Sequence, residues 1–129
     1  MLRLAEAKKE LRIVDDQVGT PNWSRLIAEA TSLIIPQLKP DFSGLFHLSS
    51  QGETSWYGFA RKIFETIRTS SDSCLVPIRS EEYPTPAKRP CYSVLSCDKL
   101  ASVFGLKLPP WDEGLSLCAA SNDFPVKKT

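Results

Sequence analysis

Apolar residues recur at helical spacing in several parts of the chain. The clearest stripe lies within 56–67 and consists of Trp56, Phe59, Ala60, Ile63, Phe64 and Ile67. Similar but shorter patterns predict helices at 23–35 and 97–104, and the segments 2–9 and 111–120 also suit helices. Each helix is expected to bury its apolar stripe and to leave its charged residues in solvent.

Residues that favour helix ends stand beside these stripes. Asn22 precedes the helix at 23–35, and Thr54 or Ser55 precedes the helix at 56–67, so their side chains are expected to cap free backbone N–H groups. Gly105 follows the helix at 97–104, where a left-handed backbone conformation commonly ends a helix. These residues fix the expected helix boundaries.

Three compact apolar runs, bounded by turn residues, predict β-strands at 11–14, 44–48 and 75–78. The run at 44–48 suits a buried strand, so we interpret His47 as a hydrogen-bonded structural residue. Pro77 lies in the third run and cannot donate a backbone hydrogen bond, which places that strand at a sheet edge.

Helices and strands together predict an α/β fold in which helices accompany a small mixed sheet. A chain of 129 residues has the length of one domain. We expect a single domain at 1–120, followed by a flexible polar tail at 121–129.

The charge balance excludes a broad electrostatic surface. Sixteen Lys and Arg residues face fifteen Asp and Glu residues, giving a net charge of +1. We therefore expect no binding to nucleic acid or to an anionic membrane, and any bound anion must be held by a local cluster.

No apolar run approaches the roughly 20 residues of a membrane span. The start of the chain lacks a secretory signal. A cytoplasmic location with four free cysteines is therefore expected.

Motifs for independent catalysis are missing from the sequence. No glycine-rich turn of the GxGxxG type follows a strand, and none of the three tyrosines is followed four residues later by lysine. A single histidine and the lack of a CxxC pair argue against a structural zinc site. We therefore expect no catalytic, cofactor-binding or metal-binding residue in this chain.

The segment 83–93, with the sequence YPTPAKRPCYS, is the one that looks like a binding site. Lys88 and Arg89 are adjacent cations between prolines, and the planar guanidinium of arginine suits bidentate capture of phosphate oxygens. Tyr83 and Tyr92 each offer an aromatic face for a base or a sugar. The composition fits a second interpretation equally well, in which 83–93 is a surface loop whose prolines prevent it from pairing with a β-strand.

Two polar loops follow predicted strands, at 16–21 and at 49–52. Ligands of open α/β sheets collect at the carboxyl ends of strands, so Gln17 and Thr20 are candidates for hydrogen bonds to a substrate. A turn followed by a capped helix explains the same residues without a ligand. Trp56 and Trp111 are expected to anchor the core or an interface.

Four segments, taken in order, resemble dTDP-4-dehydrorhamnose reductases. DDQVGTP at 15–21 is similar to the Asp-Gln-x-Gly-x-Pro segment of that family, and 44–65 resembles its Gly-x-x-His-Leu segment and the helix that follows. YPTPAKRPCYSVLSCDKL at 83–100 is close to its Tyr-Pro-Thr-Pro-Ala-x-Arg-Pro pattern, and 106–115 matches its closing Leu-Pro-x-Trp segment. The likeness covers nearly the whole chain.

The resemblance implies the carboxyl-terminal, substrate-binding part of an extended short-chain dehydrogenase/reductase. Complete members hold NADPH or NADH, and a Tyr-x-x-x-Lys pair, in an amino-terminal Rossmann half. They reduce dTDP-4-dehydro-6-deoxy-L-mannose to dTDP-L-rhamnose, and Mg²⁺ supports some of them. On this basis Arg89, Lys88, Tyr83 and Gln17 are the expected contacts to a dTDP-sugar.

The resemblance also implies that the Rossmann half is missing. We therefore expect this chain to be inactive alone, to begin at a methionine inside a helix of the complete enzyme, and to need that half or self-association to cover exposed surface. One alternative is a non-catalytic interaction module, because the regulatory subunit of methionine adenosyltransferase resembles the same region. Another is a gene remnant without function.

Overall fold

A computed structural model describes residues 9–67 and 73–121. The chain divides into two compact units. The strand unit comprises Met1–Gly19 and Glu53–Ser93, and the helical unit comprises Thr20–Gly52 and Val94–Thr129. Within the described ranges, no helix combines the length and the apolar character that crossing a bilayer requires.

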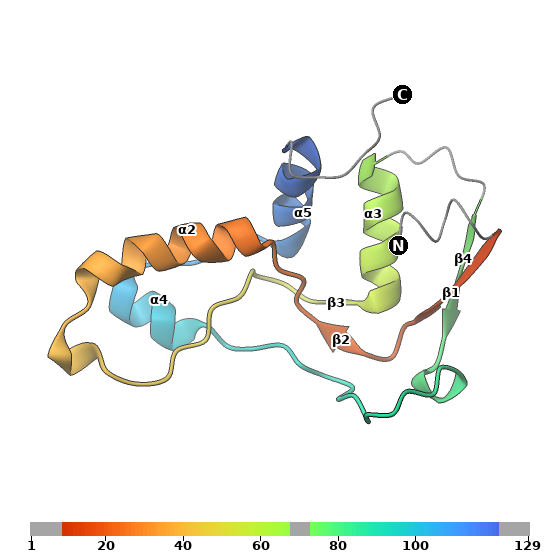
Figure 1. Cartoon of the computed structure of the whole chain (residues 1–129), viewed down its shortest axis with the longest axis horizontal. Coiled ribbons are helices and arrows are strands. Elements are labelled where there is room, and N and C mark those ends of the chain that lie inside the picture. The colour runs from red at the N-terminus through yellow and green to blue at the C-terminus, as the bar shows by residue number, and fades with distance from the viewer. Residues whose placement is uncertain (1–8, 68–72, 122–129) are drawn as a thin grey trace. The chain divides into compact units, whose positions relative to one another are not determined.

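The strand unit is built on a parallel pair of strands, β1 (Glu10–Val14) and β4 (Cys74–Ile78). Parallel strands need a crossover, and the helix α3 (Trp56–Ile67) supplies it. The helix packs on both strands (Figure 1). Buried side chains of the three elements form one small core. That core contains Leu11, Ala60, Ile63 and Ile78.

A second, shorter strand pair lies at the start of α3. Strand β2 (Val18–Gly19) runs antiparallel to β3 (Thr54–Ser55). The Ser55 hydroxyl accepts a hydrogen bond of 2.9 Å from the Gly58 backbone N–H and so caps α3, as one of the two predicted residues. A Cβ at Gly58 would lie 2.4 Å from the Thr54 hydroxyl oxygen, which explains why glycine stands there.

The helical unit contains α2 (Ser24–Ile34), α4 (Asp98–Phe104) and α5 (Trp111–Ala120), with the short 3₁₀ turns η1 (Ile35–Gln37) and η2 (Pro40–Phe42). These helices match the predicted ones to within two residues at each end. As predicted, α4 ends at Gly105, whose φ is 63°. The buried apolar residues of this unit are Ala30, Leu100, Phe104, Leu108 and Leu115.

The predicted strand at 44–48 is wrong, because no strand within the described residues pairs with it. The segment is a loop in which Leu45 is 76% exposed and His47 is exposed, so His47 does not occupy the buried strand position predicted for it. Individual contacts hold this loop in place. Phe46 stacks edge-on against Phe104, and the Lys99 ammonium donates to the Leu45 carbonyl.

Two further predictions are corrected. Asn22 does not cap α2, because its side chain instead donates to the Thr20 carbonyl and accepts from the Ser50 backbone N–H. Trp56 starts the stripe of α3 but is 54% exposed, and the buried residues of this helix are the later Ala60 and Ile63. The predicted helix at 2–9 and the predicted tail at 121–129 lie outside the described residues, except for residues 9 and 121 at their ends.

Candidate ligand-binding site

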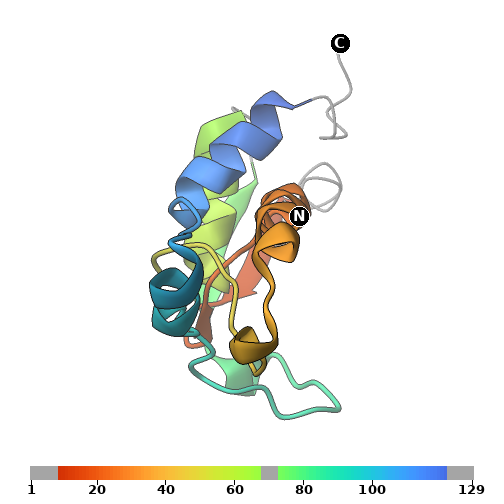
Figure 2. The ribbon, with the colours of Figure 1, turned by 90° about the vertical axis from the view of Figure 1, so that its left-hand side faces the viewer.

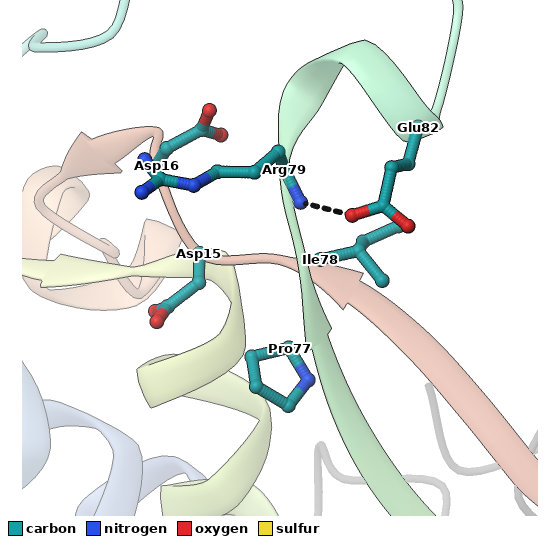
Figure 3. A pocket seen from close by; sticks show the side chains of 6 residues that line it. All are labelled: Asp15, Asp16, Pro77, Ile78, Arg79 and Glu82. Carbon is teal, nitrogen blue, oxygen red and sulfur yellow. Dashed lines mark hydrogen bonds between the residues drawn. The ribbon is translucent and has the colours of Figure 1, made fainter.

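The carboxyl ends of β1 and β4 meet at one edge of the strand pair. Because the strands are parallel and in register, the residues after Val14 lie beside the residues after Ile78. A shallow pocket of about 370 Å³ opens there (Figure 3). Its lining comes from both strand ends and consists of Asp15, Asp16, Pro77, Ile78, Arg79 and Glu82.

Asp16 fastens the segment after β4 to the segment after β1. Its carboxylate accepts from the Ser80 hydroxyl at 2.6 Å and from the Ser80 backbone N–H at 3.0 and 3.1 Å. The Gln17 amide donates to the same hydroxyl at 2.8 Å. The bonds from the Ser80 side chain and backbone lower the pKa of Asp16, and the Arg79 guanidinium, which extends toward Asp16 in Figure 3, adds to this effect.

The segment 91–93 is fastened to the same part of the chain. The Val18 backbone N–H donates to the Cys91 carbonyl at 2.8 Å, and the Ser93 N–H donates to the Val18 carbonyl at 2.9 Å. The Tyr92 hydroxyl donates to the Glu53 carboxylate at 2.6 Å. This hydrogen bond, together with the negative charge of Glu53, raises the pKa of Tyr92.

Between these two attachments, the chain forms an exposed loop. It leaves through the 3₁₀ turn η3 (Ser80–Glu82), and every residue of 83–93 is exposed. The ribbon of Figure 2 shows this segment as a loop without helix or strand. The Thr85 hydroxyl donates to the Ala87 carbonyl inside the loop. No hydrogen bond or ion pair within the described part of the chain engages Lys88 or Arg89, so both cations face solvent.

Comparison with known proteins identifies the family. The sequence profile of the RmlD substrate binding domain matches residues 1–123, nearly the whole chain. The chain belongs to this family. The prediction made from the four sequence segments is therefore confirmed.

Several relatives of the chain are dTDP-4-dehydrorhamnose reductases. The chain is 39% identical to the dTDP-4-dehydrorhamnose reductase of Burkholderia thailandensis, over 92% of this chain and 44% of that protein. It is 42% identical to the reductase of Sinorhizobium fredii, over 88% of this chain and 40% of that protein. The chain thus spans about two fifths of the length of these relatives.

Solved reductases share the fold. The dTDP-4-dehydrorhamnose reductase of Clostridium acetobutylicum superposes with a TM-score of 0.80 at 37% identity, over 90% of this chain and 40% of that one. The Bacillus anthracis enzyme, solved in complex with NADP, gives a TM-score of 0.79 at 30% identity over the same shares. The predicted α/β class is confirmed, and the strands of the described residues form two short pairs.

The glycine spacing of this RmlD-type domain does not fit a dinucleotide, and its described residues do not fit a divalent cation. The two closest of its six glycines, Gly52 and Gly58, are six positions apart, too far to form a dinucleotide-binding turn. Among the described residues, no group of three His, Cys, Asp or Glu side chains could hold a metal ion. In the pocket, Asp15 accepts from Ser55, and Glu82 pairs with Arg12. We therefore derive no step through NAD(P)H or Mg²⁺.

The RmlD-type domain brings the four predicted contact residues into one unit. Gln17 lies at the base of the 83–93 loop, and Tyr83, Lys88 and Arg89 lie on it. Sequence reasoning named the 16–21 loop after the first strand but missed the roles of Asp16 and Ser80, although the start of that loop at Asp16 was a usable signal. By contrast, Thr20 binds the Gly52 carbonyl within the helical unit, where it serves the fold.

The other candidate loop of the domain, 49–52, also serves the fold of the helical unit. Ser49 and Ser50 are buried, and the Gln51 amide donates to the Leu108 carbonyl at 2.6 Å. The burial and the hydrogen bond of these side chains therefore agree with the interpretation of 49–52 as a turn without a ligand.

The Asp16–Ser80 contact predicts a dependence of stability on pH. Because the folded-state pKa of Asp16 lies below its ordinary value of 3.8, the contact stabilises the fold above that value. This contribution is lost as the pH falls through the folded-state pKa. The difference in unfolding free energy between wild type and Asp16→Asn should therefore shrink below pH 3.8. Urea denaturation from pH 7 to pH 3 measures it, and a difference that grows on acidification would contradict the assignment.

Proposed function

We propose that this chain is the sugar-nucleotide-binding part of a dTDP-4-dehydrorhamnose reductase. The observation that carries the proposal is the 83–93 loop, which is fastened at both ends and presents Lys88 and Arg89 with no hydrogen bond or ion pair to residues 9–67 or 73–121. In this proposal Arg89 and Lys88 bind the diphosphate of a dTDP-sugar. Tyr83 packs on its base or a sugar, and Gln17 completes the site at the base of the loop.

The physical chemistry of the loop suits a diphosphate. A guanidinium donates two parallel hydrogen bonds to phosphate oxygens, and a neighbouring ammonium adds charge without fixed geometry. Prolines 84, 86 and 90 restrict the backbone of the loop, so less conformational entropy is lost on binding. Since the whole chain has a net charge of only +1, attraction of the ligand depends on this local pair.

The reduction itself is assigned to the rest of the enzyme. NADPH or NADH would supply the hydride for the 4-keto group and would be held outside this chain, whose sequence contains neither a dinucleotide-binding turn nor a Tyr-x-x-x-Lys pair. We infer that the chain alone is inactive, works in the cytoplasm as part of a longer reductase, and binds the sugar nucleotide weakly. Its role is to hold and orient the substrate for the nucleotide-binding half.

Titration with dTDP-rhamnose tests the proposal directly. In heteronuclear NMR spectra of the ¹⁵N-labelled chain, saturable shifts are expected for backbone amides of 83–93 and for the Gln17 side chain. Amides of α5 provide the internal reference, because α5 contains none of the four proposed contact residues. No shift up to millimolar ligand, or shifts spread evenly over the chain, would contradict the proposal.

The exposure of Trp56 favours one alternative, a non-catalytic interaction module. This side chain is 54% exposed at the start of α3, and aromatic residues concentrate at the centres of protein interfaces. Trp111, the other candidate anchor, packs close to Gly52 instead, since a Cβ at Gly52 would lie 3.3 Å from its indole. A chain that is silent toward dTDP-rhamnose would favour this alternative.

A further inference from the structure

We propose that Asp16 is a positioning residue for the cationic 83–93 loop. It acts through Ser80, the first residue of η3, from which the loop departs. The inference rests on the proposed function, and it adds to that function a residue that need not touch the ligand. Asp16 would set the direction in which Arg89 is presented.

The geometry around Ser80 carries the inference. Its hydroxyl donates to Asp16 and accepts from Gln17, so both hydrogen-bonding roles of the hydroxyl are occupied. Its backbone N–H donates to the same carboxylate, which gives Asp16 two donors on one residue. Side chain and backbone of Ser80 are thereby fixed together. The first turn of η3 can then leave the strand pair in a single orientation.

The loop has a second attachment that depends on the same segment after β1. Val18 exchanges two backbone hydrogen bonds with residues 91 and 93. Asp16 thus holds one end of the exposed loop at Ser80, 64 positions later in the chain. Val18 holds the other end at Ser93, 75 positions later. Loosening one end leaves the loop tethered, with its cations free to sample more directions. Binding would then require ordering the loop, and that entropy cost lowers affinity.

The neighbours of Asp16 have other partners or other roles. The Asp15 carboxylate accepts from the Ser55 hydroxyl at the start of α3, and Glu82 accepts from the Arg79 backbone N–H and pairs with Arg12. The Arg79 side chain extends across the pocket toward Asp16 and supports its charge (Figure 3). Among the acidic groups of this pocket, Asp16 is thus the one that joins the end of β1 to Ser80.

The decisive experiment compares Asp16→Asn with wild type, both without and with ligand. Without ligand, amide hydrogen exchange in 83–93 should quicken in the variant, while exchange in α3 stays unchanged. With ligand, the dissociation constant for dTDP-rhamnose should rise roughly 3- to 10-fold, the size of a coupling between contacting groups. Ser80→Ala should reproduce both effects from the other side of the contact. The matched control is Glu65→Gln, which removes one carboxylate from an exposed ion pair with Arg61 on α3.

A double-mutant comparison separates positioning from general stability. In an Arg89→Lys background, Asp16→Asn should weaken binding less than it does in wild type, because lysine cannot use the fixed direction that a bidentate fork requires. Full additivity of the two changes would overturn the positioning role. So would unchanged loop exchange in both Asp16→Asn and Ser80→Ala.

The result that would overturn the proposed function differs from the results that would overturn the positioning role of Asp16. If wild type does not bind dTDP-rhamnose, or if Arg89→Ala binds as wild type does, the loop is not a diphosphate site, and the positioning role falls with it. If Arg89→Ala weakens binding while Asp16→Asn and Ser80→Ala leave it unchanged, only the positioning role is wrong.

Discussion

Replacing Arg89 with alanine is expected to weaken binding of a dTDP-sugar about 30-fold or more, when made at the matching arginine of a full-length relative. Truncating one partner of a desolvated, hydrogen-bonded charge pair costs about 2–5 kcal/mol, and every 1.4 kcal/mol is about a tenfold change in affinity. The effect should appear when the bound diphosphate is shielded from water. Isothermal titration calorimetry with dTDP-rhamnose measures it.

Two further variants distinguish a specific contact of the Arg89 guanidinium from a general effect of net charge. Arg89→Lys keeps the charge but not the planar fork, so it should fall between wild type and alanine. Arg61→Ala removes an arginine of the same unit whose side chain pairs with Glu65 on α3, and it should leave affinity unchanged. Equal affinity for wild type and Arg89→Ala would contradict the assignment of the loop. Equal losses from Arg89→Ala and Arg61→Ala would show only a dependence on net charge.

The helices were predictable because each carries its own signal. The stripe at 56–67 marked α3 to the residue, and Gly105 marked the end of α4, where only a residue free to take positive φ fits easily. Both signals are local, since they depend on neighbours within four positions. The cap of α2 was wrong because the Asn22 side chain is engaged by Ser50, 28 positions away.

Strands were predicted less well, because pairing depends on distant partners. The parallel strands β1 and β4 were found from their apolar runs, but the two-residue strands β2 and β3 are too short to show any periodicity. The run at 44–48 has the composition of a buried strand. Its residues are instead anchored one at a time, with Phe46 on Phe104 and the Leu45 carbonyl on Lys99.

The candidate site was predictable only in part. Adjacent cations between prolines singled out Lys88 and Arg89, and the position after a strand singled out Gln17. The contact between Asp16 and Ser80 joins residues 64 positions apart, so no local pattern announces it. Composition can identify groups that would touch a ligand. The groups that orient them, Asp16 and Ser80, are brought together only by the parallel pairing of β1 with β4, which a local pattern does not reveal.

Phe104 is the centre of the aromatic cluster in the helical unit. It is 8% exposed at the end of α4, and it makes edge-to-face contacts with Phe42 and Phe46 at centroid distances of 5.7 and 5.3 Å. Such pairs add about 0.5–1.5 kcal/mol beyond the burial of their surface. Both partners come from the segment that follows α2, so one ring fastens this segment to α4.

Replacing Phe104 with alanine is therefore expected to lower the free energy of unfolding by about 3–5 kcal/mol, the usual cost of deleting a buried phenylalanine ring. The loss combines a cavity with the release of Phe42 and Phe46. Urea denaturation followed by circular dichroism measures it. Leu45→Ala is the control, because Leu45 is 76% exposed beside Phe46 and should change stability by about 0.5 kcal/mol or less. If Leu45→Ala destabilises the chain as much as Phe104→Ala does, the 44–48 segment is buried in solution, and the loop described for it is wrong.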